Sequence, residues 1–211
     1  MPLANTERKG RPMCRLPGAL ALCIVVLAPV RVAAAAGQKG QYGIRGAGLV
    51  TCQVYNQQRK ARSSAYDVIG GWMDGYITGM NQYAGDTYDA APFETTELYA
   101  ALVSEYCEKH PETRIFTVLN SLVKYHWKDR LRAPSPKVEV AAGGQEVMLY
   151  GGVIRQVQQR LSQRGYYHGK LTDSYGPSVQ KAMAAFQRSI HFRPTGFPDE
   201  ASLWQLLKTG R

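Results

Sequence analysis

Few side chains of this 211-residue chain could form a metal site or act as a nucleophile. A zinc site needs convergent His, Cys or carboxylate ligands, and a nucleophilic thiol needs a base beside it. Beyond residue 36, the cysteines and histidines are scattered along the whole length: Cys52, Cys107, His110, His126, His168 and His191. Only His110 is close in sequence to a cysteine. We expect no metal, no cofactor and no catalytic residue.

Carboxylates are the remaining candidates for chemistry. Hydrolysis of a glycosidic bond needs two carboxyl groups about 5 to 10 Å apart in a cleft. Acidic side chains that could supply such a pair lie in the first half of the chain: Asp74, Glu94, Glu97, Glu105 and Glu108. Acidic residues on helices usually form a solvated face instead. We therefore expect a non-enzyme and keep a lysozyme-like hydrolase as the alternative.

The first 36 residues have the pattern of a secretory signal peptide. Basic residues between positions 8 and 15 precede an uncharged, mostly apolar run over 16–30, and Ala33–Ala36 offers small residues for cleavage. A retained membrane anchor is the alternative, but this run is shorter than the ~20 residues that a spanning helix needs. We predict cleavage near Ala36, export to the periplasm or cell envelope, and no membrane contact afterwards.

Cleavage would remove Cys14 and Cys23 and leave Cys52 and Cys107. Two cysteines in an exported protein favour one structural disulfide, although a metal site or a nucleophilic thiol are the alternatives. The bridge would close a loop of about 55 residues and destabilise the unfolded chain by about 4 kcal/mol.

A segment rich in Pro and Gly, residues 134–146, predicts a linker between two domains, 37–133 and 147–211. The basic balance belongs to the second domain, which has nine basic and three acidic side chains. Nucleic acid is the usual partner of such a surface, but an exported protein seldom meets it. An anionic envelope polymer is the better candidate, and a merely solubilising charge is the alternative.

Apolar periodicity predicts short helices in both domains. In the second, we expect one helix over 153–164, one from Pro177 and one after Asp199. In the first, we expect helices over 64–84 and 96–108 and a third that starts at Pro111. Glycines recur every four residues along 71–79, which predicts close packing of another part of the chain; a membrane or partner-helix surface is the alternative. The fold class is therefore all-α, with two small helical domains after a signal peptide.

The turns of the second domain carry a recognisable order of residues. They run Arg164-Gly-Tyr-Tyr-His-Gly169, Asp173-Ser-Tyr-Gly-Pro177, Phe186-Gln187 and Thr195-Gly-Phe-Pro-Asp199. With the helix from Val153, these motifs resemble the peptidoglycan-binding-like domain of bacterial cell-wall hydrolases over residues 153–207. The sequence departs from the family at Val179, where Thr is usual, and at His191-Phe192, where Gly-Leu is common.

This resemblance implies non-catalytic binding of the wall glycan or its peptide stems. Tyr rings can stack on sugar faces, and Arg can pair with the carboxylates of the wall. The candidate binding residues are Arg164, Tyr166, Tyr167 and Tyr175. Each tyrosine could instead pack in the core or brace its turn.

Residues 50–130 show a fainter resemblance, through Thr51-Cys52, Gly71-Trp72-Met-Asp-Gly75-Tyr76 and Tyr106-Cys107, to two exported helical families. These are the HdeA-type acid-stress chaperones and the Tai-type immunity proteins. The resemblance supports a small disulfide-closed helical domain and makes protein binding one role open to it, without implying a particular partner or a chaperone activity. We therefore expect a periplasmic or envelope protein that holds peptidoglycan with its second domain and displays the first for an unidentified partner.

Overall fold

The computed structural model describes residues 41–209, all of which belong to one compact unit. The predicted signal peptide, residues 1–36, lies outside the described residues. Two hydrophobic cores are present, one between Cys52 and Val123 and one between Val140 and Leu207. We call the parts of the chain around these cores the N-terminal and C-terminal halves.

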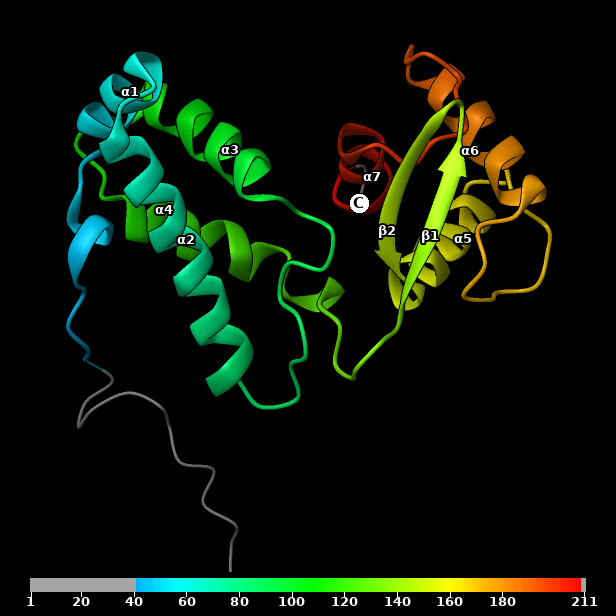
Figure 1. The fold of residues 1–211 in the computed structure, drawn as a ribbon, viewed down its shortest axis with the longest axis horizontal. Coiled ribbons are helices and arrows are strands. Elements are labelled where there is room, and N and C mark those ends of the chain that lie inside the picture. Colours follow the sequence, from blue (N-terminus) through cyan, green and yellow to red (C-terminus); the bar gives the residue numbers. More distant parts are fainter. Residues whose placement is uncertain (1–40, 210–211) are drawn as a thin grey trace, which may run out of the picture. The chain divides into compact units, whose positions relative to one another are not determined.

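The N-terminal half is helical (Figure 1). A 3-10 helix η1 (Gly46–Leu49) precedes α1 (Cys52–Ala61), α2 (Ser64–Tyr83), α3 (Thr96–Lys109) and α4 (Ile115–Tyr125), and η2 (Trp127–Asp129) follows. Ser63 and Thr95 begin α2 and α3 by accepting hydrogen bonds from the backbone N–H groups of Tyr66 and Leu98, as N-cap side chains do. The predicted helices over 64–84 and 96–108 are confirmed. The helix α1 was not predicted, because most of its side chains are polar and only Cys52 and Tyr55 of its ten residues are buried.

The predicted start of α4 at Pro111 is wrong. The backbone before Ile115 is hydrogen-bonded to the start of α1. The N–H of Cys52 donates to the carbonyl of Thr113, and the N–H of Gln53 donates to the carbonyl of Pro111, each at 2.8 Å. Residues 111–114 therefore pair with a distant segment instead of forming a helical turn. Sequence periodicity does not carry this information.

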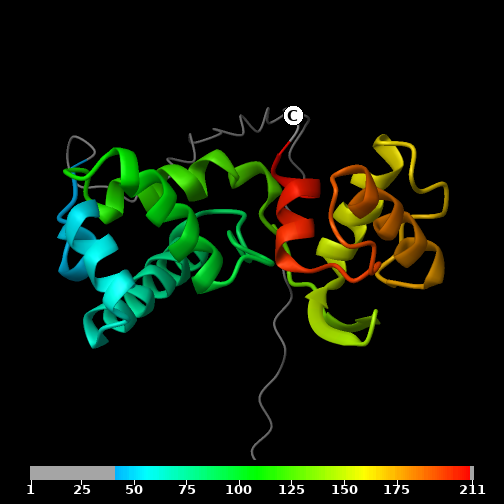
Figure 2. The same cartoon turned by 90° about the horizontal axis from the view of Figure 1, so that it is seen from above.

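The segment expected as an irregular linker forms a β-hairpin. Strands β1 (Lys137–Ala142) and β2 (Gln145–Tyr150) are antiparallel, and their register pairs Val140 with Val147. Gly143 and Gly144 both have positive φ, 57° and 77°, as a tight two-residue hairpin turn requires. One face of the hairpin packs on the C-terminal core and β2 runs on into α5 (Figures 1 and 2). The fold is therefore mostly helical with one small sheet, and not all-α.

The remaining helices of the C-terminal half are α5 (Gly151–Gln163), α6 (Pro177–Ser189) and α7 (Glu200–Leu207). The three helices predicted here are confirmed. Pro177 occupies the first turn of α6, where its missing N–H costs nothing, and the Asp199 carboxylate begins α7 by accepting from the N–H of Ser202 at 2.8 Å.

A buried ion pair joins the two halves. The Lys208 ammonium group, at the end of α7, lies 2.7 Å from the Glu94 carboxylate, and neither side chain has any exposed surface. Asp129 lies 3.8 Å from the same nitrogen. Beside this pair, the backbone N–H and the hydroxyl of Thr95 donate to the Glu200 carboxylate at 2.6 and 3.0 Å. The segment before α3 is thus fixed to α7 by charge-assisted hydrogen bonds.

The glycines of α2 do not pack as predicted. A Cβ added to Gly71, Gly75 or Gly79 would meet no atom of the chain within 4 Å. Close intramolecular packing along this stripe was therefore a wrong expectation, because the apolar side of α2 that faces the core is the one with Ile69, Met73 and Ile77. In the part of the chain that the structure describes, no helix is long and apolar enough to span a membrane.

Replacing Lys208 with Met should lower the free energy of unfolding by about 3 to 5 kcal/mol, because the Glu94 carboxylate would stay buried without its partner. The double variant Lys208→Met/Glu94→Gln should recover much of that loss. Lys181→Met, an exposed lysine on α6, is the matched control and should change stability by less than about 0.5 kcal/mol. Urea denaturation measures all three. Equal stability of the single and double variants would contradict the assigned role of the pair.

Candidate functional site

Two of the four predicted binding residues lie in the C-terminal core. Tyr167 is 6% exposed and its hydroxyl donates to the carbonyl of Lys170 at 2.8 Å. Tyr175 is 8% exposed and its hydroxyl donates to the carbonyl of Gly196 at 3.0 Å. Burial raises the pKa of Tyr175 well above its ordinary value. These rings fix the turns that contain them and offer little surface to a ligand.

The other two predicted residues lie at the edge of the core. Arg164 lies 5.2 Å from the Phe186 ring, and its guanidinium donates to the backbone carbonyls of Leu206 and Thr209 at 3.3 and 3.1 Å. Tyr166 is half-buried and meets the same Phe186 ring edge-on, with the ring centres 6.0 Å apart. Arg164 and Tyr166 are thus the two of the four that retain surface for a ligand, although Arg164 also satisfies carbonyls at the end of α7.

A fully buried glutamine holds the turn after α5. Gln158 accepts a hydrogen bond from the N–H of Thr172 at 2.7 Å and donates to the carbonyl of Ser174 at 2.8 Å. Asp173, between these two residues, pairs with Arg155 of α5 at 2.5 Å. The hydrogen bond from Arg155 holds the pKa of Asp173 below its ordinary value. This turn is therefore tied to α5 by two side chains one helical turn apart.

A second buried glutamine holds the turn before α7 in the same way. Gln187 accepts from the N–H of Gly196 at 2.8 Å and donates to the carbonyl of Phe197 at 2.8 Å and to the hydroxyl of Ser202 at 3.0 Å. Gly196 has φ of 71°, and a Cβ there would lie 2.8 Å from the carbonyl oxygen of Gln180. The sequence pattern included the Phe186-Gln187 pair but not its role. A polar residue on an apolar helix face is the signal that would have indicated both glutamines.

Besides Arg164, further cations of the C-terminal half are available to a ligand. Arg155 pairs with Asp173, Arg160 lies 3.8 Å from Asp129, and Lys208 is buried beside Glu94. Four other basic residues are exposed and form no ion pair within residues 41–209: Lys170, Lys181, Arg188 and Arg193. Lys181 and Arg188 are two turns apart on α6 and so share one of its faces. The basic balance predicted from the sequence is therefore surface charge.

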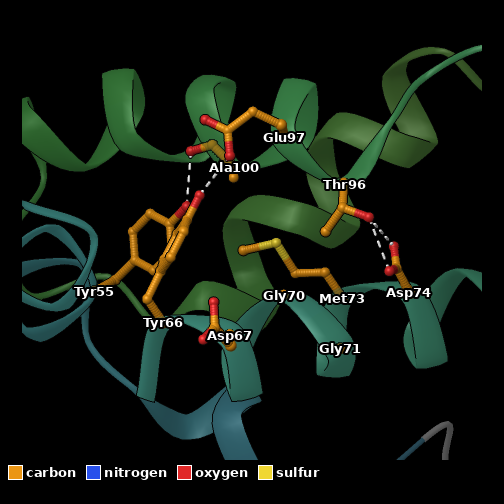
Figure 3. Close-up of a pocket in the computed structure, with 10 residues that line it drawn as sticks. All are labelled: Tyr55, Tyr66, Asp67, Gly70, Gly71, Met73, Asp74, Thr96, Glu97 and Ala100. Atoms are coloured by element: carbon orange, nitrogen blue, oxygen red, sulfur yellow. Dashed lines mark hydrogen bonds between the residues drawn. The ribbon is translucent and has the colours of Figure 1, made fainter. Parts of the chain in front are cut away.

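A pocket of about 280 Å³ lies between α2 and α3 in the N-terminal half (Figure 3). Asp67, Asp74 and Glu97 line it together with Tyr66 and other residues. Glu97 accepts hydrogen bonds from Tyr66 and Arg59, each at 2.7 Å, and these hydrogen bonds lower its pKa. The hydroxyl of Thr96 donates to Asp74 at 2.8 Å. Glu97 is thus held ionised, which is the opposite of what a proton-donating catalytic acid needs.

The remaining carboxylates that the sequence offered for hydrolysis lie elsewhere. Glu94 is buried against Lys208, while Glu105 and Glu108 are exposed on α3 and do not line this pocket. Of the five candidates, only Asp74 and Glu97 share a pocket.

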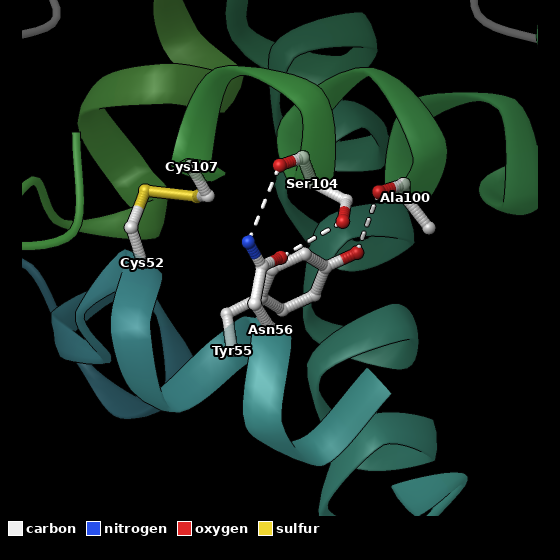
Figure 4. Close-up of a disulfide and its surroundings, with 6 residues drawn as sticks. All are labelled: Cys52, Tyr55, Asn56, Ala100, Ser104 and Cys107. Atoms are coloured by element: carbon white, nitrogen blue, oxygen red, sulfur yellow. Dashed lines mark hydrogen bonds between the residues drawn. A yellow bond between two sulfur atoms is a disulfide. The ribbon is translucent and has the colours of Figure 1, made fainter. Parts of the chain in front are cut away.

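The predicted disulfide is confirmed. Cys52 and Cys107 are bonded and buried, and they join the start of α1 to the end of α3 (Figure 4). The same two helices are joined by Tyr55, whose hydroxyl donates to the carbonyl of Ala100 at 2.8 Å. Ser104 adds a third link, because its hydroxyl donates to the Asn56 side-chain oxygen at 2.8 Å.

The C-terminal half matches a known family. Residues 150–206 match the family model described as "Putative peptidoglycan binding domain". The matched range covers α5, α6 and most of α7 with both glutamine-held turns, so it supports the resemblance seen in the sequence and supports peptidoglycan binding by this segment. Neither the comparison with curated proteins nor that with solved structures found a match. The resemblance of residues 50–130 to HdeA-type or Tai-type proteins has no support from these comparisons.

Replacing Gln187 with Leu should lower the free energy of unfolding by about 3 kcal/mol, because it leaves the N–H of Gly196 and the carbonyl of Phe197 buried without partners. Gln159→Leu, an exposed position on α5, should change it by less than about 0.5 kcal/mol. Thermal and urea unfolding of both variants measure the difference. A Gln187→Leu protein as stable as the control would show that the turn does not depend on this side chain.

Removing the disulfide by the double variant Cys52→Ala/Cys107→Ala should lower the free energy of unfolding by about 4 kcal/mol, because the unfolded chain regains the freedom of a 55-residue loop. Urea denaturation measures the loss. Digestion without reductant, followed by mass spectrometry, should find the peptides of Cys52 and Cys107 linked. Recovery of both peptides with free thiols would contradict the pairing.

Proposed function

We propose that this protein is an exported, non-catalytic protein of the bacterial envelope that holds peptidoglycan through its C-terminal half. The family match over residues 150–206 carries the proposal. The signal-peptide pattern of residues 1–36 supports export, and periplasmic or envelope localisation follows from it.

The charge of the C-terminal half supports a polyanionic ligand. Lys170, Lys181, Arg188 and Arg193 are exposed and free of acidic partners within the described chain, so each can meet a carboxylate of the wall. Tyr166 and Arg164 are the members of the predicted binding set with exposed or half-buried surface, and we keep them as contact residues. Tyr167 and Tyr175 would act by shaping their turns.

The N-terminal half has a different role in this proposal. Its disulfide and the hydrogen bonds between α1 and α3 make it a rigid body, and it is fixed to α7 through Lys208 and Glu94. A rigid body attached to a wall-binding segment is suited to display a binding surface. We propose that the N-terminal half presents such a surface to an envelope protein or ligand.

A peptidoglycan hydrolase with its catalytic site in the N-terminal half is the second candidate. The observation that favours it is the pocket shared by Asp74 and Glu97. The lowered pKa of Glu97 suits the ionised member of a glycosidase pair and not its proton donor, which this candidate must therefore find in another carboxyl of the pocket.

The test is sedimentation of the purified protein with purified sacculi, followed by chromatography of the supernatant. Wild-type protein should enter the pellet, less so as salt rises, and should release no soluble muropeptides. Replacing Lys170, Lys181, Arg188 and Arg193 together with Gln should reduce the bound fraction at least about tenfold, the size expected when several charge contacts are lost.

A matched control removes the same charge from the other half. Its four substitutions replace exposed cations that form no ion pair within residues 41–209: Lys60, Lys109, Arg114 and Lys128, each with Gln. This variant should bind sacculi like wild type. Absence of wild-type protein from the pellet at low salt would overturn wall binding, and released muropeptides would establish the hydrolase instead.

A further inference from the structure

An aromatic groove of about 520 Å³ runs along the N-terminal half between α2 and α4. Four aromatic side chains line it: Tyr42, Tyr76, Tyr83 and Phe116. Tyr42 and Tyr83 are 59% and 71% exposed, so two of the four rings present most of their surface to solvent. The proposed function assigns no particular ligand to this surface.

Three of the four rings of the groove, Tyr42, Tyr76 and Phe116, are held in place by contacts with one another. Tyr76 stacks on Trp72 with ring centres 5.6 Å apart, and it meets Phe116 edge-on at 5.5 Å. Tyr42 also meets Phe116 edge-on, with the ring centres 5.7 Å apart. The Tyr76 hydroxyl donates to the Asn120 side-chain oxygen at 2.8 Å, and burial raises the pKa of Tyr76 to about 12. These three rings therefore form a pre-organised apolar platform beside the exposed Tyr83 ring.

Glycines open the α2 side of this platform. Gly75 and Gly79 line the groove, and a Cβ at either position would meet no atom of the chain within 4 Å. A flat ligand can therefore approach the helix backbone between the rings. Each glycine costs helix stability of about 1 kcal/mol relative to Ala, a cost that the packing of the chain itself does not offset.

The polar groups of the groove select the ligand. The side-chain oxygen of Asn120 accepts the hydrogen bond from Tyr76, so its amide N–H groups remain as donors for another partner. Lys124 is exposed and forms no ion pair within the described residues. No acidic side chain lines the groove. Ring faces, amide donors and one positive charge complement a chain of sugar rings that carries carboxylates.

We propose that this groove is a second carbohydrate-binding site, which takes a carboxylate-bearing glycan strand such as that of peptidoglycan. The proposal rests on the proposed function, because it places a second contact with the same polymer on the half expected only to display a surface. Two sites on one rigid chain bind one polymer more tightly than either alone.

The sharpest test fills the groove without harming the fold. Gly79→Leu places a side chain where the protein has open space, so the variant should be at least as stable as wild type while the groove is blocked. Gly71→Leu is the matched control, since it puts the same side chain on the same helix in equally open space, but at the pocket next to α3. Tyr83→Ala and Tyr125→Ala form a second pair, because both tyrosines are 71% exposed and only Tyr83 lines the groove.

The probe is soluble glycan strands released from purified sacculi by sonication, with binding measured by titration calorimetry. Gly79→Leu and Tyr83→Ala should weaken binding at least about tenfold relative to wild type. Gly71→Leu and Tyr125→Ala should bind like wild type. Thermal unfolding of each variant checks that the fold is intact.

The outcomes separate this site from the proposed function. If the four-cation variant of the C-terminal half loses binding while Gly79→Leu binds like wild type, the wall-binding function stands and the groove is not a glycan site. If wild-type protein binds neither strands nor sacculi, both proposals are wrong. If Gly79→Leu turns a dimer into a monomer, or abolishes binding to phospholipid vesicles while glycan binding persists, the groove takes a second copy or a lipid surface and the inference is overturned.

Discussion

Polar groups that leave water must find hydrogen-bond partners inside the protein, and this constraint determines the conformation of two turns in the C-terminal half. Gln158 and Gln187 are fully buried, and each offers one amide to the backbone of a neighbouring turn. Neither turn has enough backbone hydrogen bonds of its own, so the glutamines supply them. Tyr167 and Tyr175 are buried in the same half and add hydrogen bonds to these loops. The loops of the segment that matches the family therefore depend on side chains that are themselves buried.

The same constraint explains how the two halves are held together. The side chains of Lys208 and Glu94 have no exposed surface. Burial of these two charges is tolerated because they lie against each other, and the hydrogen bond from Thr95 to Glu200 lies beside them. A joint of this kind is more specific than a purely apolar one, since a rotated arrangement would leave a charge buried alone. If both proposed surfaces bind one polymer, this joint would hold them on a single body.

The two surfaces differ in chemistry. The C-terminal half has exposed cations without acidic partners among residues 41–209, whereas the groove of the N-terminal half has pre-ordered aromatic rings and one lysine. An anionic glycan, the ligand that we propose for both surfaces, carries carboxylates that could pair with the cations and sugar faces that could stack on the rings. The pocket of Asp74 and Glu97 is different again, because these two carboxylates already accept hydrogen bonds from Thr96, Tyr66 and Arg59.

The sequence alone determined the features that depend on local pattern. Apolar periodicity, the proline at 177 and the N-cap at Asp199 predicted the three C-terminal helices, and two remaining cysteines predicted the disulfide. Tertiary structure decided what depends on distant partners. Residues 111–114 pair with the start of α1, the glycines of α2 face open space, and the predicted ligand tyrosines 167 and 175 are buried. Side-chain type and spacing specify an element and its apolar face, but whether a ring or a glycine on it is covered depends on packing across the fold.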